Sequence, residues 1–330
     1  MVNNKIVDRF GRVHDYLRIS LTDKCNLRCF YCMPEESYDF TPMKHLMSSE
    51  EIEIIANHFI RLGVNKIRLT GGEPMVRSDF GDIILRLAKL PVSLHITTNA
   101  ILLDRYFDTL REAGIDTLNI SLDTLSPEKF KKLTRRDKFD ITLQNITDAL
   151  ERGFQVKINM VVMRDFNEDE IIDFAAWTKN EKLDVRFIEF MPFEGNKWTS
   201  NQVFSLKEII SLVESRYEIQ AVEGTLHDTA KHYKILGHQG EFSVISTMSA
   251  PFCAGCNRLR LTADGKMKNC LFSKNESDLL GALRNGLPLE PLILQNISTK
   301  AEKLGGQFNV DFNELKQENL ENRSMISIGG

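Results

Sequence analysis

The sequence predicts an α/β protein in which helices cover a parallel β-sheet that is either open or curled into a barrel. Short runs rich in Ile, Val, Leu, Phe or Thr alternate with helical patterns before residue 195. Strand, helix and strand repeated in this way require crossover connections, which make neighbouring strands parallel. The expected strands are residues 17–21, 66–70, 94–98, 117–122, 155–162 and 185–190.

Helix signals separate these runs. Between the first two, apolar residues keep the i, i+3, i+4, i+7, i+8 spacing of an amphipathic helix: Ile52, Ile55, Ala56, Phe59 and Ile60. Two later helix starts have the form of a capping box, in which an N-cap side chain and a Glu three residues on exchange hydrogen bonds with backbone amides. These pairs are Asn167 with Glu170 and Ser205 with Glu208.

The alternation stops at residues 192–203, where Pro, Gly and Asn residues gather. We therefore predict a first region over residues 1–195 and a second over residues 196–330. The second region is expected to be smaller and of α+β type, with a helix at 206–215 and antiparallel runs at 231–236 and 241–247.

Composition places the chain among ordinary globular proteins. Its 330 residues are 42% hydrophobic and 27% charged, which excludes collagen-like, low-complexity and wholly disordered proteins. A net charge of −4 gives no support to a general nucleic-acid binder, which needs a basic surplus for phosphate contacts. With no secretory signal or long apolar run in view, we expect a cytoplasmic protein without a membrane or nucleic acid as partner. Its 6 cysteines are then expected to be thiols or metal ligands.

Polar side chains share one face of several expected strands. Because side chains alternate along a strand, Lys66, Arg68 and Thr70 point the same way. The same holds for Arg18, Ser20 and Thr22, for Asn119, Ser121 and Asp123, and for Lys157 and Asn159. An ordinary barrel interior is filled with branched apolar residues, so this cationic face predicts a cavity for an anionic ligand. The alternative is an antiparallel sheet with one solvated face.

The first cysteine triplet is Cys25, Cys29 and Cys32, a C-x3-C-x2-C pattern directly after the first strand. Three thiolates can hold a [4Fe–4S] cluster by three of its irons, whereas an ordinary ferredoxin cluster uses four cysteines. The fourth iron would then be free to bind a small molecule. The alternative is a structural zinc site with His45 or His58 as its fourth ligand.

The second triplet is Cys253, Cys256 and Cys270, spaced C-x2-C-x13-C. No His lies between Cys253 and Cys270, and no second C-x2-C pair follows, so a closed tetrahedral zinc site lacks its fourth ligand. Three ligands again indicate a cluster with one open iron.

A basic strand is expected between these cysteines, at residues 257–265, where it enters an Asp-Gly hairpin turn. Arg258 and Arg260 would project to one face, and two guanidinium forks suit phosphate oxygens. The alternative for such alternating arginines is the solvated face of an edge strand.

The first triplet, together with Thr70-Gly-Gly-Glu-Pro74 after the second strand, resembles the radical S-adenosylmethionine (SAM) superfamily. Paired glycines at a strand end let the backbone approach a ligand closely. The resemblance implies a partial (β/α)6 TIM-type barrel, with the smaller α+β C-terminal region closing the barrel mouth.

With the second triplet, Arg258-Leu-Arg260 and a terminal Gly329-Gly330, the chain resembles the GTP 3′,8-cyclase family from about Phe10 onward. Other matching segments are 15–18, 68–74, 97–99, 121–123, 186–191 and 328–330. Ala100 stands where that family usually has Gly. The resemblance implies a SAM-dependent lyase that converts GTP to 3′,8-cyclo-7,8-dihydro-GTP, the first step of molybdenum cofactor biosynthesis.

The same resemblance implies the site residues and cofactors. It assigns the first triplet to the [4Fe–4S] cluster that cleaves SAM, and the second triplet to a [4Fe–4S] cluster whose open iron binds guanine. Contacts to SAM are implied for Tyr31, Gly72, Ser121 and Met191. GTP is assigned to Arg18, Arg68, Thr97, Lys157, Arg258, Leu259 and Arg260, and a catalytic role to Arg258, Arg260, Gly329 and Gly330.

Expected partners are GTP, SAM, a one-electron donor of unknown identity and the next enzyme of the pathway, cyclic pyranopterin monophosphate synthase, with the chain a monomer or homodimer. Two other functions are compatible with the pattern. One is a radical SAM enzyme that modifies peptides through auxiliary clusters, although that class typically has more C-terminal cysteines than three. The other is a zinc-dependent binding module without catalysis. A C-terminal tail could also simply fray.

Overall fold

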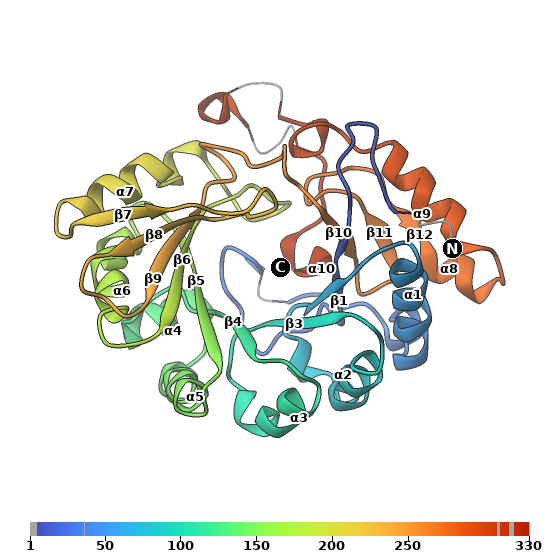
Figure 1. The fold of residues 1–330 in the computed structure, drawn as a ribbon, viewed down its shortest axis with the longest axis horizontal. Helices are drawn as coiled ribbons and strands as arrows, with labels where there is room; N and C mark the ends of the chain where they lie inside the picture. Colours follow the sequence, from blue (N-terminus) through green and yellow to red (C-terminus); the bar gives the residue numbers. More distant parts are fainter. Residues whose placement is uncertain (1–4, 36, 309–310, 317–319, 330) are drawn as a thin grey trace.

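A computed structural model describes residues 5–35, 37–308, 311–316 and 320–329. Six parallel strands follow one another in chain order and curve into a partial barrel (Figure 1). They are β1 (Tyr16–Ser20), β2 (Lys66–Thr70), β3 (Ser93–Thr98), β4 (Thr117–Ser121), β5 (Gln155–Val162) and β6 (Leu183–Glu189). Every pairing among these strands is parallel. The first and last residues of each strand lie within two positions of those predicted. The antiparallel alternative is therefore wrong.

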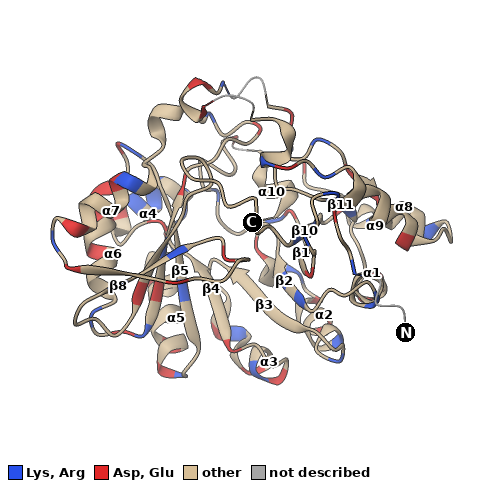
Figure 2. Cartoon of the chain, turned by 45° about the horizontal axis from the view of Figure 1, so that its top comes forward, with Lys and Arg blue, Asp and Glu red and all other residues tan. Residues whose placement is uncertain are grey.

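Helices cover the convex side of the sheet (Figure 1). They are α1 (Ser49–Arg61), α2 (Phe80–Leu87), α3 (Phe107–Glu112), α4 (Pro127–Thr134), α5 (Phe139–Glu151) and α6 (Ile171–Trp177). In α1 the predicted apolar stripe is confirmed, since Ile52, Ile55, Ala56 and Phe59 are fully buried. Lys or Arg positions and Asp or Glu positions are interspersed along the outer helices (Figure 2). The apolar core thus lies between sheet and helices and leaves the concave side free for a site.

One of the two predicted capping boxes forms. Ser205 and Glu208 exchange the expected bonds at the start of α7 (Leu206–Glu214). Asn167 caps nothing, because its buried amide donates to the carbonyls of Asp123 and Val161 instead. The prediction for Asn167 and Glu170 is therefore wrong: a fully buried amide satisfies the ends of β4 and β5 rather than a helix terminus.

The second region extends the same sheet at both edges. At one edge β9 (Glu241–Ile245) runs parallel to β6, followed by antiparallel β8 (Lys231–Ile235) and β7 (Ile219–Val222). At the other, β10 (Arg258–Leu261) runs parallel to β1, followed by antiparallel β11 (Lys266–Lys268) and β12 (Ser277–Asp278). The antiparallel pairing predicted for 231–236 and 241–247 is confirmed.

The remaining helices close the structure around this sheet. Helices α8 (Leu279–Arg284) and α9 (Leu289–Ser298) pack beside β11, while α10 (Met325–Ile328) lies inside the curve of the barrel (Figure 1). Short 3-10 turns occupy Met43–His45, Pro74–Val76, Leu103–Arg105, Glu168–Glu170, Ser200–Gln202, Leu304–Gly306 and Phe312–Glu314. Within the described ranges, no helix has the length and apolar character needed to cross a membrane.

Candidate active site

A cavity of about 660 Å³ occupies the concave side of the sheet. Its wall includes residues of β1 to β6, the loops of both cysteine triplets, and Met325 and Ile326 of α10. All six cysteines line it and none is in a disulfide. The two cysteine triplets, at opposite ends of the sequence, therefore open into one space.

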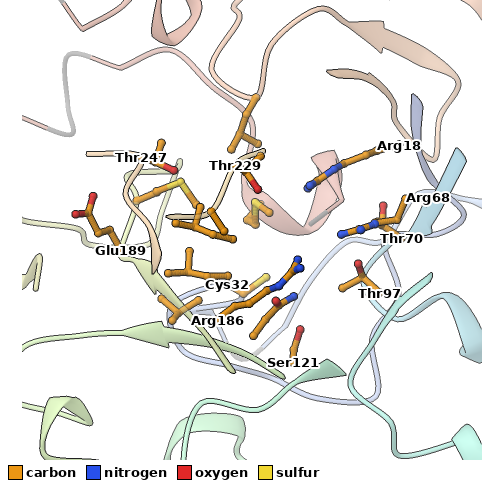
Figure 3. Close-up of a pocket in the computed structure, with 18 of the residues that line it drawn as sticks. Arg18, Cys32, Arg68, Thr70, Thr97, Ser121, Arg186, Glu189, Thr229 and Thr247 are labelled. Atoms are coloured by element: carbon orange, nitrogen blue, oxygen red, sulfur yellow. The ribbon is translucent and has the colours of Figure 1, made fainter. Parts of the chain in front are cut away.

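The predicted cationic face forms one wall of this cavity. Arg18, Arg68 and Arg186 point toward one another across it (Figure 3). Lys66 and Lys157 also line the wall, as do Thr70, Thr97, Ser121, Asp123 and Asn159. Ser20, Thr22 and Asn119, which share the predicted face, are buried without lining the cavity. The inference of a polar, cationic cavity is thus confirmed, with three of its residues placed behind the wall.

Asp184 pairs with Arg186 at 2.6 Å and lies 3.9 Å from Lys157, whereas no carboxylate of the described residues forms an ion pair with Arg18, Lys66 or Arg68. The Nε of Arg68 and the Nδ1 of His95 are buried, and neither has a hydrogen-bond partner among the described residues. Burial, together with Lys66 and Arg68, lowers the pKa of His95 to about 3. Burial raises the pKa of Tyr16, yet Arg18, Arg68 and Lys66 together lower it to about 8. Such an excess of buried positive charge fits a polyanionic ligand.

Strand β10 brings a further pair of arginines to the same wall. Arg258 and Arg260 both line the cavity, so the prediction that they project to one face is confirmed. The Arg260 side chain lies beside Arg18, because the two residues are paired in register across β10 and β1. Burial, with Arg18 second, lowers the pKa of Arg260 to about 9. The solvated-edge alternative is wrong, since Arg260 is only 7% exposed.

Leu259 does not line this wall. Its side chain is fully buried in the hydrophobic core on the opposite face of β10. The alternation that aims Arg258 and Arg260 at the cavity necessarily turns the residue between them away. The assignment of Leu259 to GTP stays a prediction, and with its side chain in the core any such contact would come from its backbone.

The first triplet lies on a loop fixed by backbone bonds to the end of α4. Phe30 N donates to Leu133 O (3.0 Å), and Cys32 N donates to Cys29 O (2.9 Å). Burial raises the pKa of Cys25 to about 11 and of Cys32 to about 12, with repulsion between the two thiols adding to the effect on Cys32. The cation of a metal centre is what would hold such thiols as thiolates.

The spacing of the sulfur atoms favours a cluster over a single ion. A zinc ion with Zn–S bonds of about 2.3 Å holds its sulfurs about 3.8 Å apart. Among the described residues, a set of three ligand atoms within 4.8 Å of one another occurs at Asp184, His232 and Glu241, and at neither cysteine triplet. A cubane needs no such compact set, because each sulfur binds a different iron. Three thiols without a compact single-ion arrangement are the donor set expected of a [4Fe–4S] cluster with one open iron.

The histidines of the zinc alternative lie elsewhere. His58 accepts a hydrogen bond from Arg61 and contacts Glu290 at 3.3 Å. His45 lines a separate surface cavity beside the Asp-Gly turn. Neither lines the cavity of the cysteines, so the structure contradicts the zinc site that would use them.

The Gly-Gly-Glu segment after β2 packs tightly against the chain leading to Cys25. Gly72 N donates to Thr22 O (2.7 Å), and Glu73 N donates to Lys24 O (2.9 Å). A Cβ at Gly72 would lie 2.4 Å from Lys24 O, which no real Cβ tolerates. Glu73 accepts from Thr98 Oγ1 and Asn99 N, and its burial raises its pKa to about 7. The predicted SAM residues Tyr31, Gly72, Ser121 and Met191 all line the cavity.

The turn after β3 explains the glycine expected at position 100. Ala100 adopts a positive φ of 64° while fully buried. Glycine enters this left-handed region without the steric cost that a Cβ imposes. The chain therefore keeps the turn and places a strained alanine in it.

Met325 and Ile326 of the C-terminal tail line the cavity, whereas Gly329 is buried against Ser20 and Thr70 and is not a lining residue. Arg260 Nη1 donates to Gly329 O (2.6 Å), and a Cβ at Gly329 would lie 2.8 Å from atoms of Ser20 and Thr70. Only a residue without a side chain fits between β1 and β2 here. Gly330 lies outside the described residues.

Lys66, His95 and Arg186 are among the cavity residues that the predicted site set does not include. Lys66 lies on the predicted cationic face, and His95 and Arg186 alternate with buried Ile96 and Phe187. The alternation of polar and apolar residues along β3 and β6 could have identified them.

Two family models match the chain in succession. The radical SAM superfamily covers residues 19–178, and the model for molybdenum cofactor synthesis C covers residues 183–305. The chain is 46% identical to the mitochondrial GTP 3′,8-cyclase of Arabidopsis thaliana, covering all of this chain and 84% of that one. It is 39% identical to the GTP 3′,8-cyclase of Listeria monocytogenes, covering 98% of each. The chain belongs to the GTP 3′,8-cyclase family.

Other relatives are longer. The chain is 46% identical to molybdenum cofactor biosynthesis protein 1 of Homo sapiens over 98% of its own length, but it spans about half, 51%, of that protein. The cofactors of this family are SAM and [4Fe–4S] clusters, the second cluster going with the C-terminal family model.

Solved structures confirm the fold class. SuiB of Streptococcus suis bound to its precursor peptide superimposes with a TM-score of 0.60 at 16% identity, covering 86% of this chain and 67% of that one. At that identity the likeness concerns the fold alone, a partial barrel of the radical SAM superfamily.

Proposed function

We propose that this member of the GTP 3′,8-cyclase family converts GTP to 3′,8-cyclo-7,8-dihydro-GTP in a SAM-dependent reaction. One observation carries the proposal: both cysteine triplets and the cationic strand face line the same cavity. A cavity of that kind can hold a sulfonium donor beside a nucleoside triphosphate. The resemblance of the whole chain to cyclases of this family supports the same substrate.

A [4Fe–4S] cluster at the first triplet would supply the electron for cleaving SAM to methionine and a 5′-deoxyadenosyl group, which would leave as 5′-deoxyadenosine with the C3′ hydrogen of GTP. C3′ would then bond to C8, and a second electron with a proton would complete the 7,8-dihydro product. Cys25, Cys29 and Cys32 would hold that cluster. The paired glycines at 71–72 would admit the methionyl end of SAM close to the backbone. Tyr31, Ser121 and Met191 would contact SAM from the remaining sides.

The triphosphate would lie against the cationic wall. Arg18, Arg68, Lys157, Arg258 and Arg260 all face the cavity, and Arg forks bind phosphate oxygens with two parallel hydrogen bonds. Thr97, Lys66 and Arg186 add a hydroxyl donor and two positive charges. Holding the phosphates fixes where the ribose lies, and this positioning is the protein's main contribution to a reaction whose chemistry belongs to the cofactors.

The second triplet would hold the cluster that binds guanine. Cys253, Cys256 and Cys270 lie beside Arg258 and Arg260, so the base and its phosphates would be held from one strand. Gly329 and Gly330 would close the remaining gap and exclude water from the reacting carbons.

The two regions of the chain would have different roles in this reaction. Residues 1–195 would hold SAM, and residues 196–330 would hold the second cluster and close the barrel. The electron donor would be a separate one-electron carrier, and the product would pass to cyclic pyranopterin monophosphate synthase. We propose a cytoplasmic monomer or homodimer.

An anaerobic assay of the reconstituted chain tests the function. With GTP, SAM and a one-electron reductant, we expect 5′-deoxyadenosine and the cyclised nucleotide in equal amounts. Deleting Gly329 and Gly330 should abolish the cyclised nucleotide while both clusters remain. The proposal would be contradicted if 5′-deoxyadenosine formed while GTP, and every other nucleoside triphosphate supplied in its place, was left unchanged.

A further inference from the structure

We infer that Arg323 is a positioning residue, which fixes the root of the C-terminal tail to the β10–β11 hairpin and thereby sets where Gly329 and Arg260 lie. This inference rests on the proposed function, because it assigns the tail a place beside the substrate. Arg323 itself does not line the cavity and acts through the residues that do.

The root of the tail is held by a two-carboxylate bridge. Arg323 Nη1 and Nη2 donate to the two oxygens of Asp264 at 3.0 and 3.1 Å, and Nη2 also donates to Glu276 at 2.6 Å. Asp264 lies in the turn between β10 and β11, and Glu276 directly precedes β12. The three side chains are only 16–26% exposed. A bidentate, partly buried bridge of this kind is stronger than an exposed ion pair.

A second set of bonds fixes the neighbouring residue to the same hairpin. Asn322 Nδ2 donates to Leu271 O (3.0 Å), directly after Cys270. Lys268 Nζ donates to Asn322 Oδ1 at 3.2 Å and lies 3.5 Å from Glu276. Lys268 is 1% exposed, so its ammonium group depends on these protein atoms for the hydrogen bonds that water would otherwise accept. The root of the tail is thus tied both to the hairpin and to the loop of the second cysteine triplet.

The tip of the tail is held by the same hairpin. Arg260 of β10 donates to Gly329 O, as described above. Between root and tip, Ile328 is 1% exposed and packs with Phe272 and Phe193. Arg260 therefore donates to the Gly329 carbonyl and would also bind the phosphates proposed to lie beside Arg18.

Because one hairpin carries Arg258, Arg260 and both anchors of the tail, their relative positions are fixed as a unit. Without the Arg323 bridge, the tail would depend on its other contacts, which include the bonds of Asn322, the two bonds between Gln307 and Glu321, the burial of Ile326 and Ile328, and the hydrogen bond at Gly329. The tail would leave the cavity more often, and Arg260 would lose the acceptor that orients it. The effect should appear as tail mobility before it appears as any loss of clusters.

The test compares Arg323→Gln with Arg323→Lys in the full chain carrying both clusters. Arg284→Gln is the matched control, since Arg284 also forms a two-bond bridge to a carboxylate, Glu51, but on the outer surface at α8. For Arg323→Gln we expect hydrogen exchange in residues 325–330 to rise about tenfold, as for the loss of one charge-assisted bond. Arg323→Lys should restore part of that protection, and Arg284→Gln should leave it unchanged.

Kinetics separate positioning from general damage. In the full chain, Arg323→Gln should lower kcat about tenfold both for the cyclised nucleotide and for the 5′-deoxyadenosine formed with it, with unchanged iron content and unchanged SAM affinity. In a chain lacking Gly329 and Gly330, the same substitution should cause no further loss of SAM cleavage, because Arg323 is inferred to act by positioning those two residues. If Arg323→Gln folds poorly, Glu276→Gln weakens the same bridge and takes its place.

Unchanged exchange in residues 325–330 would overturn the inference, as would an equal loss of SAM cleavage in the full and truncated chains. A wild-type chain that forms no cyclised nucleotide would refute the proposed function instead. The exchange measurement would still report whether Arg323 holds the tail.

Discussion

Replacing Gly72 by Ala should disrupt the site more than any exposed substitution, because the added methyl has no space. Its Cβ would meet three backbone atoms, Lys24 O at 2.4 Å, Lys24 C at 2.7 Å and Asp23 O at 2.8 Å. Backbone cannot move aside as a flexible side chain can. Overpacking of this kind typically costs about 1–3 kcal/mol.

Relief of that clash would break the two hydrogen bonds that join Gly72 to Thr22 and Glu73 to Lys24. Each contributes about 1 kcal/mol net. We therefore expect the free energy of unfolding of the cofactor-free chain to fall by about 3 kcal/mol. Because the displaced segment leads into Cys25, the reconstituted variant should also bind SAM weakly and retain less iron.

Gly81→Ala is the control for this experiment. Gly81 lies in α2, and a Cβ there would meet nothing within 4 Å. A helical Gly→Ala change with open space for the methyl group should stabilise the chain by about 0.5–1 kcal/mol. Urea unfolding of both variants gives the comparison. A Gly72→Ala chain as stable as wild type, with normal SAM binding, would refute the packing argument for the glycine pair.

Three further predictions concern the turn at Ala100, the protonation of His95 and the arginines proposed to bind phosphate. Ala100→Gly should raise the free energy of unfolding by about 1 kcal/mol in urea melts, since it relieves a buried positive φ; a loss of stability would contradict the turn geometry. The pKa of His95 is lowered from 6.5 to about 3 in the folded chain, so its contribution to stability is complete above pH 6.5 and is lost as the pH falls toward 3. His95→Gln should therefore flatten the dependence of the urea midpoint on pH below 6.5, and an unaltered slope would show that His95 is not desolvated. Arg258→Ala and Arg260→Ala should each weaken GTP binding about tenfold in calorimetry while SAM cleavage continues, and unchanged affinity in both would count against the phosphate wall.

The barrel could be predicted from sequence because its signals are local. Alternation along β2 and β5 and the spacing of apolar residues in α1 follow from the periods of strand and helix. The cysteine spacings indicated ligand sets for the same reason. The cationic wall follows from alternation alone, and the same alternation on β6, where Arg186 lies between buried Val185 and Phe187, also turns Arg186 toward the cavity.

Other features depend on contacts that sequence does not encode locally. The pairing of β10 with β1 joins residues about 240 positions apart, and it is this pairing that brings Arg260 next to Arg18. Asn167 is of a residue type that favours helix N-caps, yet its buried amide donates to the carbonyl of Asp123 instead. In both cases tertiary packing decided what the local pattern could not. Leu259 is different, because strand alternation itself turns its side chain into the core.

Iron, sulfide and zinc analysis of the anaerobically prepared chain tests the central claim most directly. Two three-cysteine sites that open into one cavity predict about eight irons and eight sulfides per chain. The electron paramagnetic resonance signals of the reduced clusters should then respond separately, one to SAM and the other to GTP. Stoichiometric zinc without sulfide, or a signal indifferent to both ligands, would contradict the account.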